Sequence, residues 1–229
     1  MTAPGALRPV LFDLDGTLLD TAPDMVAALN RLRAEEGREP LPFAAMRRFV
    51  SHGSARLVQQ GFPDAGGTEY ERLRQRYLAI YREALAVETC LFPGFEAVLD
   101  ALDADSVPWG IVTNKPGWLT DPLLDALGLA DRAAAVVSGD TLPERKPHPA
   151  PLLHAARRIG REPGEFVCLG DAERDIQAAR AAGMLALVAC FGYLGPDDDP
   201  EQWQPDGMID APGDLLAWLA ESAVAGACP

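Results

Sequence analysis

Short, continuous apolar runs separated by amphipathic stretches are the feature that most restricts the fold of this chain. Continuous runs, rather than alternating apolar and polar residues, are typical of parallel strands that helices cover on both faces. The alternation of such runs with helical patterns predicts an α/β fold, an open, mostly parallel Rossmann-like sheet with helices on both faces. The predicted strands are residues 10–12, 109–112, 135–137, 166–169, 185–188 and 207–209.

One interval interrupts this alternation. Between residues 20 and 90 apolar residues recur at three- and four-residue steps, over residues 26–32 and 70–84, and no strand pattern is found. The spacing predicts helices inserted after the first strand. We therefore expect a core of residues 1–19 and 91–229 and a helical cap domain of residues 20–90.

Charge and length narrow the class of partner. The 229 residues carry 20 Lys+Arg against 34 Asp+Glu, a formal charge of −14. Phosphate backbones and anionic membranes are bound by basic surfaces, so we expect neither nucleic acid nor a membrane as partner. No apolar run approaches the ~20 residues needed to span a bilayer.

The cysteines and the N-terminal residues bear on the compartment. Four cysteines are present, and none forms a Cys-x-x-Cys pair, so neither a zinc site nor a redox motif is indicated. The first residues do not resemble a signal peptide. We expect a reducing, cytoplasmic location.

Polar residues follow the predicted strands. In open α/β sheets, ligands bind beyond the carboxyl ends of the strands, so these side chains are expected to meet at one edge. The set consists of carboxylates, a hydroxyl, an amide and a lysine: Asp13, Asp15, Thr113, Asn114, Lys146, Asp171 and Asp175.

Asp13-Leu14-Asp15-Gly16-Thr17 carries the most information. The spacing of two residues lets both carboxylates face one pocket at a strand end. Adjacent carboxylates repel unless a cation lies between them or their pKa values separate, and separated pKa values suit a nucleophile and an acid/base. The alternative is a pair of turn or helix-capping aspartates.

Asp171 and Asp175 are four residues apart at the start of a predicted helix and share a face. Hard carboxylate oxygens that converge here and at Asp13 are the ligands that Mg²⁺ prefers. The alternative is that Asp171 caps the helix and Asp175 pairs with an arginine on the same helix.

Thr113, Asn114 and Lys146 complete the set. On their own, Thr113 and Asn114 are typical of a turn in which the hydroxyl satisfies the backbone, and Lys146 of a solvated surface lysine. Together with the carboxylates they fit an anion site, because a phosphate group needs a cation. Lys146 and Arg145 are the cations that we expect in the loops at this edge.

The motifs Asp-Leu-Asp-Gly-Thr, Thr-Asn-Lys, Lys-Pro-His-Pro and Gly-Asp-x-x-x-Asp, in this order, resemble those of the haloacid dehalogenase-like hydrolases. The resemblance covers essentially the whole chain, including the position of the helical insertion. Within the superfamily the chain looks most like bacterial phosphoglycolate phosphatases. Residues 191–203 resemble relatives that dephosphorylate N-acetylmuramic acid 6-phosphate.

The resemblance implies a phosphatase that acts on a small phosphorylated metabolite through an aspartyl-phosphate. Asp13 would be the nucleophile, and Asp15 would protonate the leaving group and then activate water. Asp15 favours phosphate esters, because dehalogenases and phosphonatases of the superfamily lack an aspartate at this position. Lys146 would neutralise charge on the phosphoryl group.

The resemblance also implies a Mg²⁺ site and a phosphoryl site. Mg²⁺ would be held by the Asp13 side chain, the Asp15 backbone carbonyl and Asp171, with Asp175 in support. Thr113 and the Asn114 amide would bind phosphoryl oxygens.

The segment 50–56 is the candidate for substrate contact from the cap. A loop that leads into a helix presents backbone N–H groups to an anion, with His52 beside it, and Arg56 is suited to bind a carboxylate. The alternative is a surface loop followed by a solvated helix face.

Other functions remain open on the sequence. A phosphomutase would use the same residues behind a cap that excludes water, and a phosphorylatable signalling domain also places carboxylates and a lysine at a sheet edge. The helical insertion and the Asp-x-Asp-Gly-Thr motif count against the signalling domain. Monomer and homodimer are both compatible with the sequence.

Overall fold

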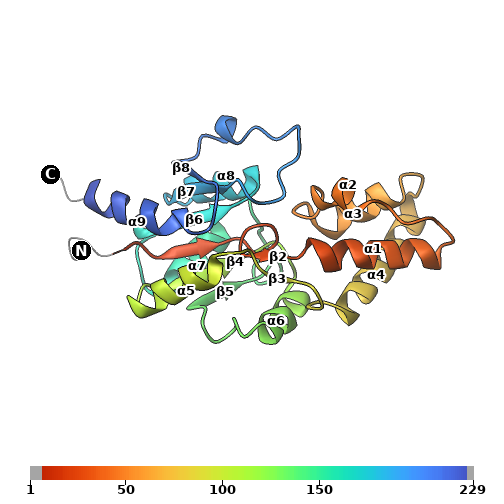
Figure 1. Cartoon of the computed structure of the whole chain (residues 1–229), viewed down its shortest axis with the longest axis horizontal. Coiled ribbons are helices and arrows are strands. Elements are labelled where there is room, and N and C mark those ends of the chain that lie inside the picture. The colour runs from red at the N-terminus through yellow and green to blue at the C-terminus, as the bar shows by residue number, and fades with distance from the viewer. Residues whose placement is uncertain (1–6, 226–229) are drawn as a thin grey trace.

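Six strands form one sheet, in the order β5-β4-β1-β6-β7-β8, and every neighbouring pair is parallel. The computed structural model describes residues 7–225 (Figure 1). All six predicted apolar runs are strands, and the predicted α/β fold is confirmed. The strands are β1 (Val10–Phe12), β4 (Trp109–Val112), β5 (Ala135–Val137), β6 (Val167–Gly170), β7 (Leu185–Ala189) and β8 (Gly207–Ile209).

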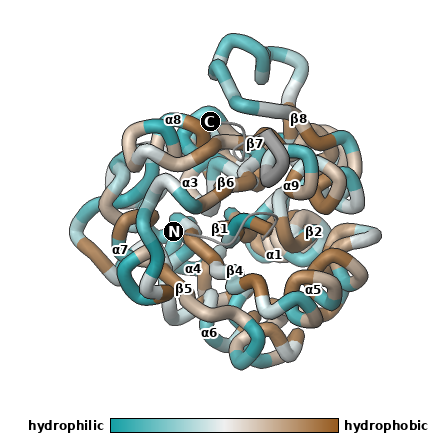
Figure 2. Tube along the Cα trace, turned by 90° about the vertical axis from the view of Figure 1, so that its left-hand side faces the viewer, coloured by the Kyte–Doolittle hydropathy of each residue, from teal (hydrophilic) through white to brown (hydrophobic). Residues whose placement is uncertain are grey.

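Helices cover both faces of this sheet, which explains why the strands are continuously apolar. Val10 and Phe12 pack into one core, whereas Leu11 packs into a second core on the opposite face. The first core includes residues of α5 (Phe95–Ala104) and α9 (Asp214–Ala225); the second includes residues of α7 (Ala150–Ile159) and α8 (Glu173–Ala181). Figure 2 shows the two helix pairs on either side of the strands. A further helix, α6 (Gly117–Ala126), follows β4.

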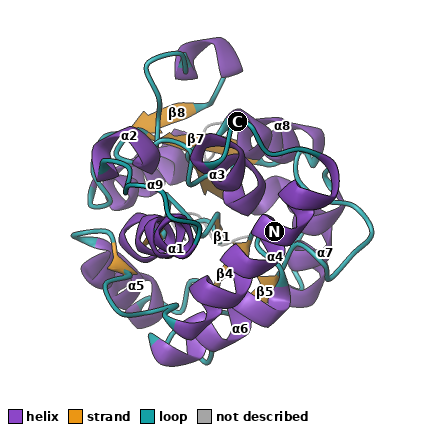
Figure 3. Cartoon of the chain, turned by 90° about the vertical axis from the view of Figure 1, so that its right-hand side faces the viewer, coloured by secondary structure: helices purple, strands orange, loops and turns teal. Residues whose placement is uncertain are grey.

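Along the sequence, four helices follow the first strand within residues 20–90, as the periodicity predicts. They are α1 (Ala22–Glu35), α2 (Phe43–Arg47), α3 (Gly53–Gly61) and α4 (Gly67–Glu83), and we call residues 22–83 the helical segment. The segment lies beyond the end towards which β1 runs, and α1, α3 and α4 stand in front of the strands in Figure 3. The division into a core of residues 1–19 and 91–229 and a cap domain of residues 20–90 stays a prediction.

The expectation of no strand between residues 20 and 90 was wrong at both ends. β2 (Leu19–Asp20) and β3 (Cys90–Leu91) pair as a two-stranded antiparallel ribbon that brackets the helical segment. A strand of two residues has no measurable periodicity, so the sequence pattern does not reveal it.

The buried carboxylate of Asp24 ties the two ends of the helical segment together. It accepts hydrogen bonds from the backbone N–H groups of Val87, Glu88 and Thr89, at 2.9–3.1 Å, and from the Thr89 hydroxyl at 2.7 Å. These donors lie just before β3, whereas Asp24 is in the first turn of α1. The bonds therefore fix where the chain enters and leaves the helical segment.

Two expectations concern residues at the chain ends and the compartment. Within residues 7–225, no helix is both long and apolar enough to cross a bilayer. Cys90, Cys168 and Cys190 are free thiols. Cys228 and the first six residues, on which the signal-peptide expectation rests, lie outside the described residues.

We predict that Asp24→Asn lowers the free energy of unfolding by about 2–4 kcal/mol, because a neutral amide presents an N–H₂ group to several donors. Thermal unfolding followed by circular dichroism measures the effect. Asp64→Asn, at a side chain that is 85% exposed, is the control and should change little. A loss of similar size in both variants would contradict the role given to Asp24.

Candidate active site

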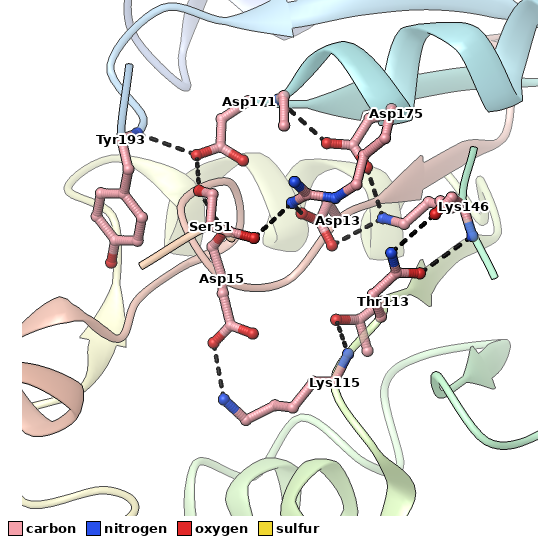
Figure 4. Close-up of polar contacts among 12 residues, drawn as sticks. Asp13, Asp15, Ser51, Thr113, Lys115, Lys146, Asp171, Asp175 and Tyr193 are labelled. Carbon is pink, nitrogen blue, oxygen red and sulfur yellow. Dashed lines mark hydrogen bonds and ion pairs between the residues drawn. The ribbon is translucent and has the colours of Figure 1, made fainter. Parts of the chain in front are cut away.

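Polar side chains from three neighbouring strands meet at the carboxyl edge of the sheet, on the side of the helical segment (Figure 4). Asp13 directly follows β1, Thr113 follows β4 and Asp171 follows β6. The backbone continues the ladder for one more residue, since Asp13 N donates to Leu169 O at 2.9 Å and Thr113 N to Val137 O at 2.9 Å. These bonds fix the direction of the side chains.

Three buried carboxylates form an acidic cluster. Asp13, Asp171 and Asp175 each offer an oxygen atom, and the three atoms lie within 4.8 Å of one another. Burial, together with the charges of Asp13 and Asp175, raises the pKa of Asp171 to about 7. Burial also raises the pKa of Asp13, despite Lys146. At Asp175 burial acts in the same sense, but Lys146 and Arg174 outweigh it and the pKa is lowered.

Lys146 is buried against this cluster and is not a surface lysine. Its Nζ lies 2.8 Å from Asp13 Oδ1 and 2.8 Å from Asp175 Oδ1, and it donates to Val112 O at 2.6 Å. Burial lowers the pKa of Lys146, but the charges of Asp13 and Asp175 outweigh burial and raise it, so the ammonium is charged.

Thr113 and Asn114 both hold backbone in place. Thr113 Oγ1 accepts a hydrogen bond from Lys115 N at 3.1 Å, which is the turn contact considered from the sequence, and the hydroxyl hydrogen is left for another acceptor. The Asn114 side chain bonds both backbone groups of Lys146: its Nδ2 donates to the carbonyl at 2.9 Å and its Oδ1 accepts from N–H at 3.1 Å. Asn114 therefore positions Lys146.

Gly16 allows the loop after β1 to approach the acidic cluster. Its φ of +93° is in the left-handed region, and a Cβ at this position would lie 2.2 Å from Asp171 Oδ2. Gly170 is equally restricted, since a Cβ there would lie 2.3 Å from the Cβ of Asp175. The backbone therefore packs against the carboxylates without room for a side chain.

The donor set fits a hard divalent cation. Asp171 Oδ2 accepts hydrogen bonds from Ser51 Oγ and from Tyr193 N at 3.0 Å, but the buried Oδ1 has no hydrogen-bond partner among the described residues. An unpartnered buried carboxylate oxygen beside two further carboxylates is costly unless a cation binds it. The alternative in which Asp171 caps α8 is not found: it is Asp175 Oδ2 that accepts a hydrogen bond from N–H of the N-cap residue Ala172, at 3.1 Å.

The carboxylate of Asp15 does not join this cluster, although the spacing predicts one pocket for Asp13 and Asp15. It lies 2.8 Å from Lys115 Nζ and accepts from Thr21 Oγ1 at 2.7 Å, away from Asp171 and Asp175 in Figure 4. Its backbone carbonyl faces Ser51 Oγ at 3.4 Å.

Of the two cations expected at this edge, Lys146 is present, but Arg145 is not, and two other cations were missed. Arg145 is exposed, and the other cations at this edge are Lys115 and Arg174. Arg174 Nη2 lies 3.9 Å from Asp13 Oδ2 and donates to Ser51 O at 2.8 Å. Both residues lie inside the sequence motifs, Lys115 directly after Thr113-Asn114 and Arg174 between Asp171 and Asp175. Their positions in the motifs could have identified them as cations of the site. Ser51, which lies in the segment 50–56, was not singled out within it.

His52 and Arg56 lie beside this site but not in it. They line a groove of about 500 Å³ between α3 and α4, with Gln59 and Tyr70. Arg56 Nη1 donates to Gln59 Oε1 at 2.9 Å, and its guanidinium lies 5.5 Å from the centre of the Phe49 ring. Their roles in substrate contact stay predictions.

A doubly wound parallel sheet with buried carboxylates and lysines at its carboxyl edge places this chain among the α/β proteins that bind ligands at that edge. The chain matches the model of the haloacid dehalogenase-like hydrolase family over residues 10–189. It belongs to this family, as the four motifs predict.

Similar proteins extend over nearly the whole chain. A phosphoglycolate phosphatase of Xylella fastidiosa is 46% identical over 205 residues, which cover 90% of each chain. An N-acetylmuramic acid 6-phosphate phosphatase of Pseudomonas aeruginosa is 38% identical over 211 residues, 92% of this chain and 93% of that one. The crystal structure of a predicted phosphoglycolate phosphatase from Haemophilus somnus has a TM-score of 0.82 at 28% identity and covers 93% of this chain and 98% of its own.

We predict that Asp171→Asn stabilises the metal-free protein by about 1–3 kcal/mol at pH 8. The pKa of Asp171 is about 7 in the folded protein and 3.8 in the unfolded chain. Ionisation of Asp171 therefore costs the folded wild-type protein stability as the pH rises from 4 to 7, and the Asn variant avoids this cost. The gain in melting temperature, measured in EDTA, should therefore grow from pH 5 to pH 8.

Asp175→Asn is the matched control. The pKa of Asp175 is lowered in the folded protein, so its charge is stabilising above the unfolded pKa, and its removal should lower the melting temperature. A fall in melting temperature in both variants would show that the three carboxylates do not repel one another as described.

Proposed function

We propose that the chain is a Mg²⁺-dependent phosphatase that hydrolyses a small phosphomonoester, 2-phosphoglycolate, to glycolate and phosphate through an aspartyl-phosphate intermediate. The observation that carries the proposal is Asp13, a buried carboxylate held 2.8 Å from the buried Lys146 within the acidic cluster. The 46% identity to phosphoglycolate phosphatases supports the reaction and the substrate.

The charges of the site support a cation cofactor and an anionic substrate. The carboxylates of Asp13, Asp15, Asp171 and Asp175 face three cations, those of Lys115, Lys146 and Arg174, so one negative charge is in excess when all four carboxylates are ionised. Mg²⁺ would be held by Asp13 and Asp171, with Asp175 in support and the Asp15 carbonyl facing the same side, and would supply positive charge to the phosphoryl oxygens. The site would then attract a phosphate dianion.

The residues divide the reaction into two displacements. Asp13 attacks phosphorus in line, the bond to the leaving oxygen breaks, and Asp15 gives that oxygen its proton. Asp15 then takes a proton from water, which attacks phosphorus, releases phosphate and restores the Asp13 carboxylate. Lys146 stays beside Asp13 and balances the charge that moves onto the phosphoryl group.

Thr113 and Asn114 are proposed to bind the phosphoryl oxygens. The Thr113 hydroxyl has a hydrogen to donate, since it accepts from Lys115 N. At Asn114 the backbone N–H is the donor that fits, because the side-chain amide is already bonded to the backbone of Lys146.

The helical segment is proposed to act as the cap of residues 20–90. Ser51, from the loop before α3, reaches Asp171 with its hydroxyl, and Arg174 donates to its carbonyl. These contacts bring the segment onto the acidic cluster and would exclude water during the first displacement. His52, the residue after Ser51, and Arg56, in the first turn of α3, are proposed to contact the leaving group.

A second candidate substrate is N-acetylmuramic acid 6-phosphate. It is supported by the relative in Pseudomonas aeruginosa and by the groove beside Ser51, which is roomy enough for a sugar. Residues 191–203, which resemble such relatives, include Tyr193, whose N–H donates to Asp171 Oδ2 at the site. For either substrate we propose a cytoplasmic location, in keeping with the free thiols of Cys90 and Cys168.

With Mg²⁺, we predict that kcat/KM is at least ~100-fold higher for 2-phosphoglycolate than for N-acetylmuramic acid 6-phosphate, a difference of about 2.7 kcal/mol at the transition state. Release of phosphate from both esters measures it. The reverse preference would assign the second candidate, and equal, slow turnover of both esters would contradict both assignments.

We predict that Asp13→Asn lowers kcat by at least ~1000-fold, because an amide does not form the acyl phosphate. The melting temperature shows whether the fold is kept. Near-normal turnover of the variant would exclude Asp13 as the nucleophile.

We also predict that EDTA abolishes wild-type turnover and that Mg²⁺ restores it.

A further inference from the structure

Lys115 is a buried cation at the sheet edge that has no part in the reaction as described above. Its side chain is 4% exposed and extends from the end of β4 towards the helical segment. The Nζ atom lies 2.8 Å from Asp15 Oδ1 and 3.0 Å from the hydroxyl of Tyr81 in α4 (Figure 4). A buried ammonium is costly unless it is paired, so these contacts call for an explanation.

Both backbone polar groups of Lys115 are hydrogen-bonded. Its N–H donates to Thr113 Oγ1 at 3.1 Å, and its carbonyl accepts from Gly139 N at 2.8 Å and from Thr120 Oγ1 at 3.3 Å. The base of the side chain is therefore fixed relative to the phosphoryl-binding residue Thr113.

The tip of the side chain is held by a second rigid element. Tyr81 is 1% exposed, and its ring stacks on that of Tyr77 with centroids 6.3 Å apart. The Tyr77 hydroxyl donates instead to Met25 O at 3.2 Å in α1, so it is the ring of Tyr77, and not its hydroxyl, that supports Tyr81. Because the backbone of Lys115 and the Tyr81 hydroxyl that its ammonium contacts are both fixed, the position of the ammonium is fixed as well.

This arrangement distinguishes the two oxygens of the Asp15 carboxyl group. Lys115 Nζ and Thr21 Oγ1 both donate to Oδ1, at 2.8 and 2.7 Å, and no described residue donates to Oδ2. An aspartate carboxyl group without such bonds turns freely about its last torsion. With Oδ1 engaged twice, the oxygen left to carry and exchange a proton is Oδ2.

We propose that Lys115 is a positioning residue that anchors Oδ1 of Asp15, so that Oδ2 gives its proton to the leaving oxygen and takes one from water. The inference rests on the proposed phosphatase function. As the bond from phosphorus to the leaving oxygen breaks, the proton moves from Oδ2 to that oxygen, and the carboxylate that forms is paired with the ammonium. Tyr81 orients Lys115 and so makes the helical segment part of this arrangement.

A structural ion pair would share the distances but not the dependence on the leaving group. An alkoxide needs a proton to leave, whereas nitrophenolate does not. The parameter kcat/KM reports only the steps up to departure of the leaving group when that step is irreversible. The ratio of kcat/KM for an alkyl and an aryl phosphate therefore isolates the proton transfer.

The experiment compares 2-phosphoglycolate and β-glycerophosphate with p-nitrophenyl phosphate. For Lys115→Met we expect kcat/KM to fall ~100-fold for the alkyl esters and less than ~5-fold for the aryl ester, within the range for general acid catalysis. Lys115→Arg should recover part of the loss. Tyr81→Phe, which removes only the hydroxyl, should shift the ratio in the same direction, and Tyr77→Phe, its matched control in the same stack, should not.

Equal losses on both kinds of ester in Lys115→Met and Tyr81→Phe would overturn the inference and leave a structural ion pair. Unchanged rates on the alkyl esters would overturn it as well. If Lys115→Met unfolds, judged by melting temperature, the ratio in Tyr81→Phe against Tyr77→Phe decides in its place. A wild-type protein that hydrolyses none of the esters would instead refute the proposed function, and this inference with it.

Discussion

The burial of three carboxylates within reach of one another is the constraint on which the rest of the site depends. Asp13, Asp171 and Asp175 each place an oxygen atom within 4.8 Å of the others, and burial, together with repulsion from the other two carboxylates, raises the pKa of Asp171 to about 7. Lys146 offsets part of this cost by contact with Asp13 and Asp175. Oδ1 of Asp171 has no hydrogen-bond partner among the described residues, and the proposed cation would offset the rest of this cost.

The parallel sheet makes this concentration of charge feasible. Neighbouring parallel strands end at the same edge, so β1 and β6 deliver Asp13 and Asp171 side by side while their apolar residues face the two cores. The two-stranded ribbon of β2 and β3 then returns the helical segment to that edge. The segment contributes Ser51 to the acidic cluster and Tyr81 to the contacts of Lys115.

The sequence patterns that were informative are local ones. Apolar runs located every strand of the main sheet, and the polar residues after those runs included the whole acidic cluster and Lys146. Contacts between distant segments were not accessible in the same way. The direction of the Asp15 carboxylate depends on Lys115, one hundred residues later. The place of Arg174 depends on a backbone carbonyl in the helical segment, and no local pattern encodes such a partner.

The proposed reaction requires that Asp13 becomes covalently phosphorylated during turnover. The direct measurement is a rapid acid quench of the Mg²⁺-loaded wild-type protein with 2-phosphoglycolate, followed by proteolysis and mass spectrometry of the peptide that contains Asp13. We expect a phosphoryl group on Asp13 that appears before free phosphate and disappears as substrate is consumed. Phosphate release without any labelled Asp13 peptide, or a phosphoryl group on another residue, would contradict it.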